Sequence, residues 1–167
     1  MFNIVLLEPE IALNTGNIGR TCSVTGAGLH LIRPLGFRVS EKEIKRAGLD
    51  YWESLAPVIY DDINDFYGKN PGAGERCFFA TTKAVNTYAD VTYRPGDYIM
   101  FGRESAGIPE EILARNKDMC IRIPMAHEKR SLNLSNSAAV ILYEALRQNG
   151  FDGLEKKGAL HSLEWDN

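Results

Sequence analysis

The segment "RSLNLSNSAAV" (130–140) carries a high density of polar side chains directly before the most hydrophobic predicted helix of the chain. These side chains belong to Ser131, Asn133, Ser135, Asn136 and Ser137. Serine and asparagine hydrogen-bond to nearby backbone groups, so they favour caps and turns over helix interiors. The segment is therefore either an elaborate helix N-cap or a non-helical loop whose backbone and side-chain groups bind a ligand.

Three more loops rich in glycine, asparagine or serine follow apolar runs: "PEIALNTGNIGRT", "KAVNTY" and "RESAGIP". In an open α/β sheet, ligands bind outside the carboxyl ends of the strands, where such loops converge. The sequence contains no G-x-G-x-x-G after its first strand, no P-loop motif and no G-x-S-x-G. A dinucleotide site, a P-loop nucleotide site and a hydrolase nucleophile elbow are therefore unsupported.

Strand-like and helical segments alternate along the chain. Strands are predicted at 2–8, 29–34, 56–62, 77–82, 97–102 and 119–124, and helices at 15–27, 41–48, 63–68, 109–116 and 133–148. The apolar runs at 77–82 and 97–102 are typical of buried parallel strands. This alternation predicts a three-layer α/β fold with a mostly parallel sheet. We expect one domain over residues 1–152 and a polar C-terminal tail over 153–167.

Composition indicates an ordinary soluble domain. The 167 residues are 44% hydrophobic and 25% charged, and no apolar run approaches the roughly 20 residues that cross a membrane. The N-terminus lacks the basic region of a signal peptide, so we expect a cytoplasmic protein without a membrane partner. Three widely spaced cysteines and three histidines form no ligand motif, which predicts neither a metal site nor a disulfide framework, and reduced, partly buried thiols.

The net charge of −3 argues weakly against a nucleic-acid partner. The charges are unevenly distributed, however, and one short span is basic: Arg33, Arg38, Lys42, Lys45 and Arg46. This span is either a local basic face or a set of solvated surface residues.

Three motifs together are specific. "NTGNIGR" (14–20), "FGRESAGIP" (101–109) and "RIPMAHEKRSLNLSNSAAV" (122–140) occur in this order, each after an apolar strand. They resemble the motifs of the SPOUT methyltransferases, in the branch that methylates ribose 2′-oxygens of RNA. The resemblance covers residues 4–150 and is greatest to minimal members that methylate the wobble nucleotide, cytidine or uridine 34, of tRNA.

The resemblance implies a C-terminal trefoil knot, a homodimer, and S-adenosylmethionine as the cofactor, with S-adenosylhomocysteine as the product and no metal. The cofactor would be held largely by the backbone of the knot loops. The positions that match are Ala80, Gly102, Ile123 and Ser131, with Met125 and Leu132 nearby.

The resemblance also implies the reacting residues: Arg20, Asn14, Glu104, Ser131 and Asn133. Because a guanidinium stays protonated near neutral pH, we interpret Arg20 as a group that positions the ribose or its phosphate and stabilises developing negative charge, rather than as a general base. Asn14 either caps its helix or hydrogen-bonds at the site. Glu104 orients Arg20, holds the knot, or does both.

Residues expected to contact RNA are Arg20, Arg130, Tyr143, Lys45 and Arg46. Tyr143 is equally compatible with the core or the dimer interface. Three other functions remain open: a 2′-O-methyltransferase for another RNA such as ribosomal RNA, a non-catalytic RNA-binding or dimerisation module with the same fold, and a flavodoxin-like nucleotide-binding protein.

Overall fold

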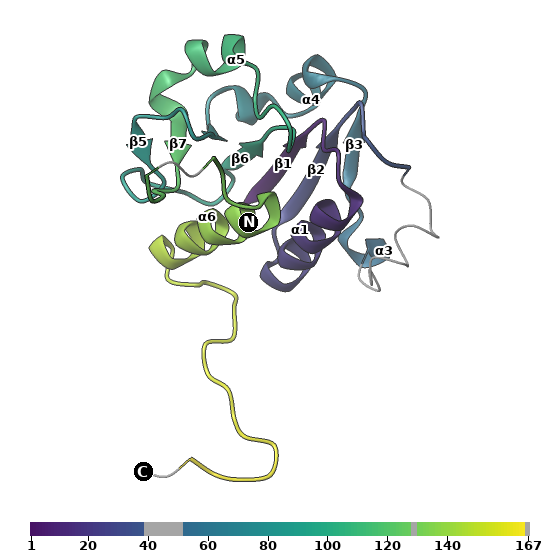
Figure 1. Ribbon diagram of the computed structural model, residues 1–167. Helices are drawn as coiled ribbons and strands as arrows, with labels where there is room; N and C mark the ends of the chain where they lie inside the picture. Colours follow the sequence, from purple (N-terminus) through teal and green to yellow (C-terminus); the bar gives the residue numbers. More distant parts are fainter. Residues whose placement is uncertain (39–51, 128–129, 166–167) are drawn as a thin grey trace.

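The computed structural model describes residues 1–38, 52–127 and 130–165, which form a parallel sheet covered by helices (Figure 1). Within these ranges the strands are β1 (Asn3–Leu7), β2 (Gly28–Ile32), β3 (Val58–Tyr60), β4 (Cys77–Ala80), β5 (Asn86–Thr87), β6 (Tyr98–Phe101) and β7 (Cys120–Arg122). The helices are α1 (Ala12–Thr25), α3 (Trp52–Leu55), α4 (Ile63–Lys69), α5 (Glu110–Arg115) and α6 (Leu134–Gln148), with 3₁₀ turns at Pro71–Gly74 and Lys117–Met119. The strand order is β3-β2-β1-β6-β4-β7-β5, and each of these pairs is parallel.

The two faces of the sheet bury separate cores. Ile4 and Leu6 of β1 pack in a cluster with residues of α1 and α6, including Ile18 and Ile141. The alternate residues Val5 and Leu7 pack in the second cluster, which contains residues of α4 and α5. Successive side chains of a strand point to opposite faces, so two helical layers enclose the sheet. The prediction of a three-layer α/β fold with a mostly parallel sheet is confirmed.

Element boundaries differ from the predictions at several places. Helix α1 begins at Ala12, three residues before its predicted start, and it ends at Thr25, followed by the C-cap Gly26 with a φ of 70°. Strand β5 and helix α3 were not predicted, because two residues in a polar stretch and a four-residue turn carry little periodicity. The helix predicted at 41–48 lies outside the described residues.

The three cysteines are buried and unpaired. The cysteines are buried more fully than the predicted partial burial, and burial raises the pKa of the Cys22 thiol to about 12. Because the thiolate is the nucleophilic form, this cysteine is poorly suited to catalysis. Among the described residues no cluster of metal-ligating side chains occurs, and no helix there is long and apolar enough to span a membrane.

An ion pair with a buried carboxylate and a partly exposed arginine fixes the connection between β4 and β6. Arg76 donates through Nε and Nη2 to the carboxylate of Asp97, at 2.8 and 2.7 Å, and Asp97 is only 2% exposed. The end of α6 holds the same connection. Gln148 accepts from the backbone N–H of Tyr93 and donates to the carbonyl of Val91, both at 3.0 Å. These contacts tie residues 91–97 to the C-terminal helix.

His30 makes stability depend on pH. Its imidazole is buried beside Tyr60, whose hydroxyl lies 2.8 Å from Nδ1, and burial lowers its pKa to about 4. An unfolded histidine titrates near pH ~6.5, so between these values the unfolded chain binds more protons. We therefore expect the free energy of unfolding to fall by about 2 kcal/mol from pH 7.5 to pH 4.5 through this residue.

Urea unfolding of the wild type and of His30→Gln at both pH values measures this contribution. The variant should lose the His30 part of the pH dependence, whereas substitution of the exposed His161 should leave it unchanged. Equal pH dependence in the wild type and His30→Gln would contradict the assignment.

Candidate functional site

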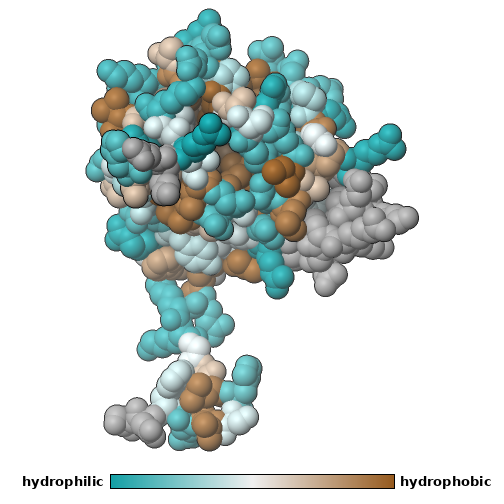
Figure 2. All heavy atoms as spheres, viewed as in Figure 1, coloured by the Kyte–Doolittle hydropathy of each residue, from teal (hydrophilic) through white to brown (hydrophobic). Residues whose placement is uncertain are grey.

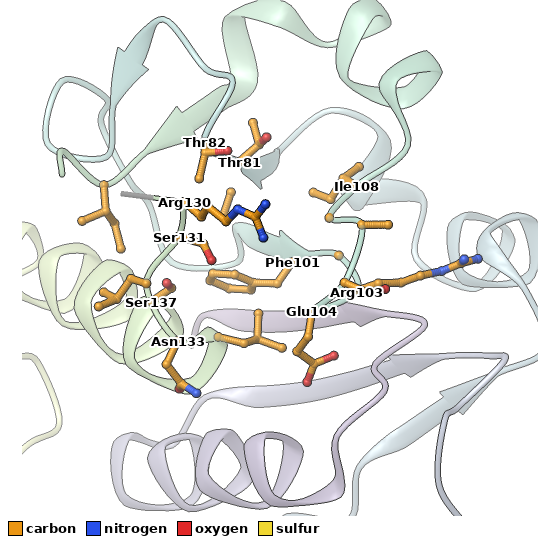
Figure 3. A pocket seen from close by; sticks show the side chains of 18 of the residues that line it. Thr81, Thr82, Phe101, Arg103, Glu104, Ile108, Arg130, Ser131, Asn133 and Ser137 are labelled. Atoms are coloured by element: carbon orange, nitrogen blue, oxygen red, sulfur yellow. The ribbon is translucent and has the colours of Figure 1, made fainter. Parts of the chain in front are cut away.

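A cavity of about 830 Å³ lies at the carboxyl ends of β4, β6 and β7 (Figure 3). Its walls come from the segments after these strands and from the beginning of α1. The convergence predicted for the post-strand loops is therefore confirmed. All six positions expected to hold a cofactor line it: Ala80, Gly102, Ile123, Met125, Ser131 and Leu132. Four other predicted residues also line it: Asn14, Glu104, Arg130 and Asn133.

Three of the predicted reacting residues form one hydrogen-bonded chain across the three motifs. Asn133 donates through Nδ2 to Oδ1 of Asn14 at 3.1 Å, and Asn14 donates through Nδ2 to Oε1 of Glu104 at 3.0 Å. The second carboxylate oxygen of Glu104 accepts the backbone N–H of Glu10 at 2.9 Å. The network orients both amides, because each has its oxygen and nitrogen roles fixed by a neighbour.

The network decides between the alternatives for Asn14 and shows one structural role of Glu104, whereas orientation of Arg20 by Glu104 stays a prediction. The N-cap of α1 is Ile11 and makes no side-chain capping bond, so the suggestion that Asn14 caps the helix is wrong. The side chain of Asn14 instead points to the site. Glu104 holds the motif-two loop against α1 through Asn14 and Glu10.

The polar stretch before α6 serves as a cap and as part of the site. Asn133 is the N-cap, and its Oδ1 accepts the backbone N–H groups of Ser135 and Asn136 at 2.9 and 3.3 Å. The same side chain reaches Asn14 through its nitrogen. Ser131 and Leu132 precede the helix, are exposed and line the cavity. The capping interpretation is therefore confirmed for Asn133, and ligand binding by the residues before it stays a prediction.

The motif-two loop is tightly turned. A Cβ on Gly102 would lie 2.1 Å from the carbonyl carbon of Gly107, and Gly107 has a φ of 72°, which favours glycine. The loop is fixed at a second point by Glu10, whose carboxylate accepts the side chain and backbone N–H of Ser105 at 2.7 and 2.8 Å. The hydrogen bond from the Ser105 side chain is the main cause of the lowered pKa of Glu10.

Sequence reasoning missed several residues of the cavity wall. Thr81, Thr82 and Lys83 follow β4, and Phe101 and Ile108 flank the motif-two loop. The loop after β4 was recognised as a candidate, but its residues carry no motif. Lys83 spans to α5, where its Nζ lies 2.6 Å from a carboxylate oxygen of Glu110.

Arg20 and Tyr143 lie elsewhere. Neither residue lines the cavity, and both side chains are exposed. Because Tyr143 is 46% exposed, the suggestion that it belongs to the core is wrong. Arg20 shares the exposed side of α1 with Leu13 and Val24, which are 59% and 61% exposed. Helices α1 and α6 pack together, and apolar side chains are exposed over both (Figure 2).

The predicted basic span is only partly described. Arg33 is exposed and pairs with Asp61 at 2.7 Å, and Arg38 is exposed. Lys42, Lys45 and Arg46 lie outside the described residues. Another arginine that the sequence did not single out, Arg103, lines the cavity and pairs with Glu8.

Comparisons with known proteins agree with this geometry. Residues 1–143 match the model of the SpoU rRNA Methylase family. The chain is 48% identical over 155 residues to the tRNA (cytidine(34)-2'-O)-methyltransferase of Escherichia coli strain K12, covering 92% of this chain and 97% of that one. It is 49% identical over 154 residues to the protein of the same name from Saccharophagus degradans, covering 92% and 99%.

Solved structures show the same similarity. One, described as giving insights into "2-OH methylation of C/U34 on tRNA", superposes with a TM-score of 0.83 at 44% identity, covering 90% of this chain and 97% of that chain. An AdoMet-bound rRNA methyltransferase from Sinorhizobium meliloti superposes with a TM-score of 0.73 at 28% identity, but this chain covers only 56% of that one.

Proposed function

The chain belongs to the SpoU rRNA methylase family, and from this premise we propose that it transfers a methyl group from S-adenosylmethionine to the ribose 2′-oxygen of nucleotide 34, cytidine or uridine, of tRNA. The observation that carries the proposal is the cavity built from all three motif loops and joined by the Asn133–Asn14–Glu104 network. Relatives named as tRNA (cytidine(34)-2'-O)-methyltransferases match almost the whole chain at nearly half identity.

The cavity fits the cofactor in size and chemistry. About 830 Å³ lies within the ~300–1,000 Å³ typical of small-molecule sites. Ile121, Ile123, Leu132 and Ile141 offer an apolar surface for a purine, and the turn at Gly102 brings backbone groups to the cavity wall. When bound, S-adenosylmethionine supplies an electrophilic methyl group. We assign its binding to Ala80, Gly102, Ile123, Met125, Ser131 and Leu132, and no metal is required.

The residues of the network act by positioning. Asn133 is held from both ends, by the N-terminus of α6 and by Asn14, and this keeps it and the nearby Ser131 in place for the ribose. Glu104 fixes the motif-two loop against α1. A fixed arrangement of polar groups lowers a reaction barrier because it needs no reorganisation during the reaction.

We further propose that the C-terminal segment is knotted. Strand β7 lies beside β4, whereas α6 packs against α1 in the core on one face of the sheet. Gln148 and Asn149 at the end of α6 bind residues 91–93 of the connection between β4 and β6. In this proposal the C-terminal segment passes through the loop formed by the connection between β4 and β6. This passage puts α6 against α1 and the motif-three loop at the cavity.

The exposed faces of α1 and α6 support a homodimer. Leu13, Val24, Val140 and Tyr143 are exposed apolar or aromatic residues on these two helices. In a symmetric dimer the same patch pairs with itself. Because Arg20 does not line the cavity of its own subunit, we infer that it serves the cavity of the partner subunit. We also propose that residues 1–152 form a single domain and that residues 153–167 form a tail. The described part of this tail runs away from the body of the protein (Figure 1). The proposed place of action is the cytoplasm, where tRNA is found.

The direct test combines purified protein, total RNA containing both tRNA and ribosomal RNA, and methyl-labelled S-adenosylmethionine, followed by mapping of the labelled ribose. We expect label at nucleotide 34. Label in ribosomal RNA alone would support the alternative substrate, and failure to bind the cofactor would favour a non-catalytic module.

Gly102→Ala should weaken cofactor binding, because a Cβ cannot fit 2.1 Å from the backbone of Gly107 and the loop must move. We expect the dissociation constant for S-adenosylmethionine to rise about tenfold or more by calorimetry. Gly72→Ala is the matched control, since its Cβ would meet nothing within 4 Å. Unchanged affinity in Gly102→Ala would remove this loop from the cofactor site.

A further inference from the structure

The two sides of the cavity differ in charge. On one side Glu104 lies with Asn14 and Asn133 next to α1. On the other side, beyond β6, lie Thr81 and Thr82 after β4, and Arg130 (Figure 3). The guanidinium of Arg130 points into the cavity from this side. The cavity therefore carries a negative group at one side and a positive group at the other.

Arg130 differs from the other cations of the cavity wall. Lys83 is paired with Glu110, and Arg103 is paired with Glu8. Arg130 makes no hydrogen bond or ion pair with any residue that the structure describes. Nearby lining residues include the buried, apolar Phe101 and Ile108, each 2% exposed. Arg130 itself is exposed, so it attracts an anionic ligand through its charge and shape: a guanidinium matches the two oxygens of a carboxylate.

This inference rests on the proposed function, because it concerns how the cofactor of that reaction is recognised. S-adenosylmethionine is positive at its sulfonium and negative at its carboxylate. We propose that Arg130 binds the carboxylate of the methionyl group and so orients the cofactor with its sulfonium toward Glu104. Arg130 is then a specificity residue: it selects a ligand with an intact amino-acid part over the bare nucleoside thioether.

A phosphate of the RNA is the other anion available to Arg130. The cofactor carboxylate is favoured for two reasons. The guanidinium points into the cavity rather than away from it. Arg130 also directly precedes Ser131 and Leu132, two lining residues assigned to the cofactor.

The test compares ligands that share the purine and the sulfur but differ in the amino-acid part. Binding of S-adenosylmethionine, S-adenosylhomocysteine and 5′-methylthioadenosine is measured by calorimetry for the wild type, Arg130→Gln and the control Arg115→Gln. We expect Arg130→Gln to weaken binding of the first two ligands about 10- to 100-fold, as for the loss of a charge-assisted hydrogen bond, and to leave 5′-methylthioadenosine unchanged. Arg115→Gln should have little effect on any of them, because Arg115 is exposed on α5 and does not line the cavity.

The opposite outcomes separate this inference from the proposed function. If Arg130→Gln binds S-adenosylmethionine as the wild type does, the carboxylate contact is wrong, and a loss of tRNA affinity in the same variant would assign Arg130 to a phosphate. Equal weakening of all three ligands would show a general loss of the loop structure and would overturn the selective role. A wild type that binds 5′-methylthioadenosine but not S-adenosylmethionine contradicts both proposals.

Discussion

Replacing Arg20 with alanine is expected to lower the rate of methyl transfer by about 100-fold or more, while the affinity for S-adenosylmethionine stays unchanged. The loss follows if Arg20 positions the ribose or its phosphate and stabilises the charge that develops on the 2′-oxygen. Cofactor binding should survive because Arg20 does not line the cavity. Single-turnover kinetics with saturating cofactor and calorimetry with S-adenosylmethionine measure the two quantities separately.

Asn17 provides the control, because it is another exposed polar residue on α1. Asn17→Ala should methylate at close to the wild-type rate. If Arg20→Ala lost cofactor affinity together with activity, a structural role for Arg20 in α1 would replace the role at the ribose.

Mixing two inactive variants tests whether Arg20 serves the partner's cavity. Arg20→Ala and Asn133→Ala subunits are allowed to exchange in equal amounts. If Arg20 acts across the dimer, each mixed dimer has one intact site, and activity should return to about one quarter of the wild-type value, since half of the dimers are mixed. No recovery, with subunit exchange verified, would place Arg20 in the site of its own subunit.

The second large effect is on stability. Asp97→Ala should lower the free energy of unfolding by about 2 kcal/mol, because it removes the buried bidentate acceptor of Arg76, whose side chain is 36% exposed. The same substitution removes the acceptor of the backbone N–H of Arg94, at 2.8 Å. Thermal and urea unfolding measure the change. Since residues 91–97 are tied to α6, the loosened connection should also expose the amide hydrogens near Tyr93 to faster exchange.

Asp61→Ala is the matched control. Asp61 also pairs with an arginine, Arg33 at 2.7 Å, but its side chain is 82% exposed. Exposed ion pairs contribute little to stability because water and salt screen them. Similar losses in the two variants would mean that burial of the Arg76–Asp97 pair is not what makes it important.

The sequence by itself determined the alternation of elements and the four loops that carry the site. The apolar runs at 77–82 and 97–102 depend only on local composition, and both became central strands of the sheet. The three motifs predicted Asn14, Glu104 and Asn133 together, and the structure joins these residues in one network. Strand β5 escaped prediction because its two residues are held by pairing with β7 rather than by any local pattern.

The tertiary structure decided which atoms meet. Asn14 and Asn133 are 119 residues apart, and their hydrogen bond depends on the packing of α6 against α1. The same packing places Arg20 on an exposed face, away from the cavity that Asn14 lines, although the motif grouped the two as reacting residues. Helical spacing explains the difference: six residues at about 3.6 per turn rotate a side chain roughly two thirds of the way around the helix. Local spacing fixes such angles, but only the packed core decides which angle faces the cavity.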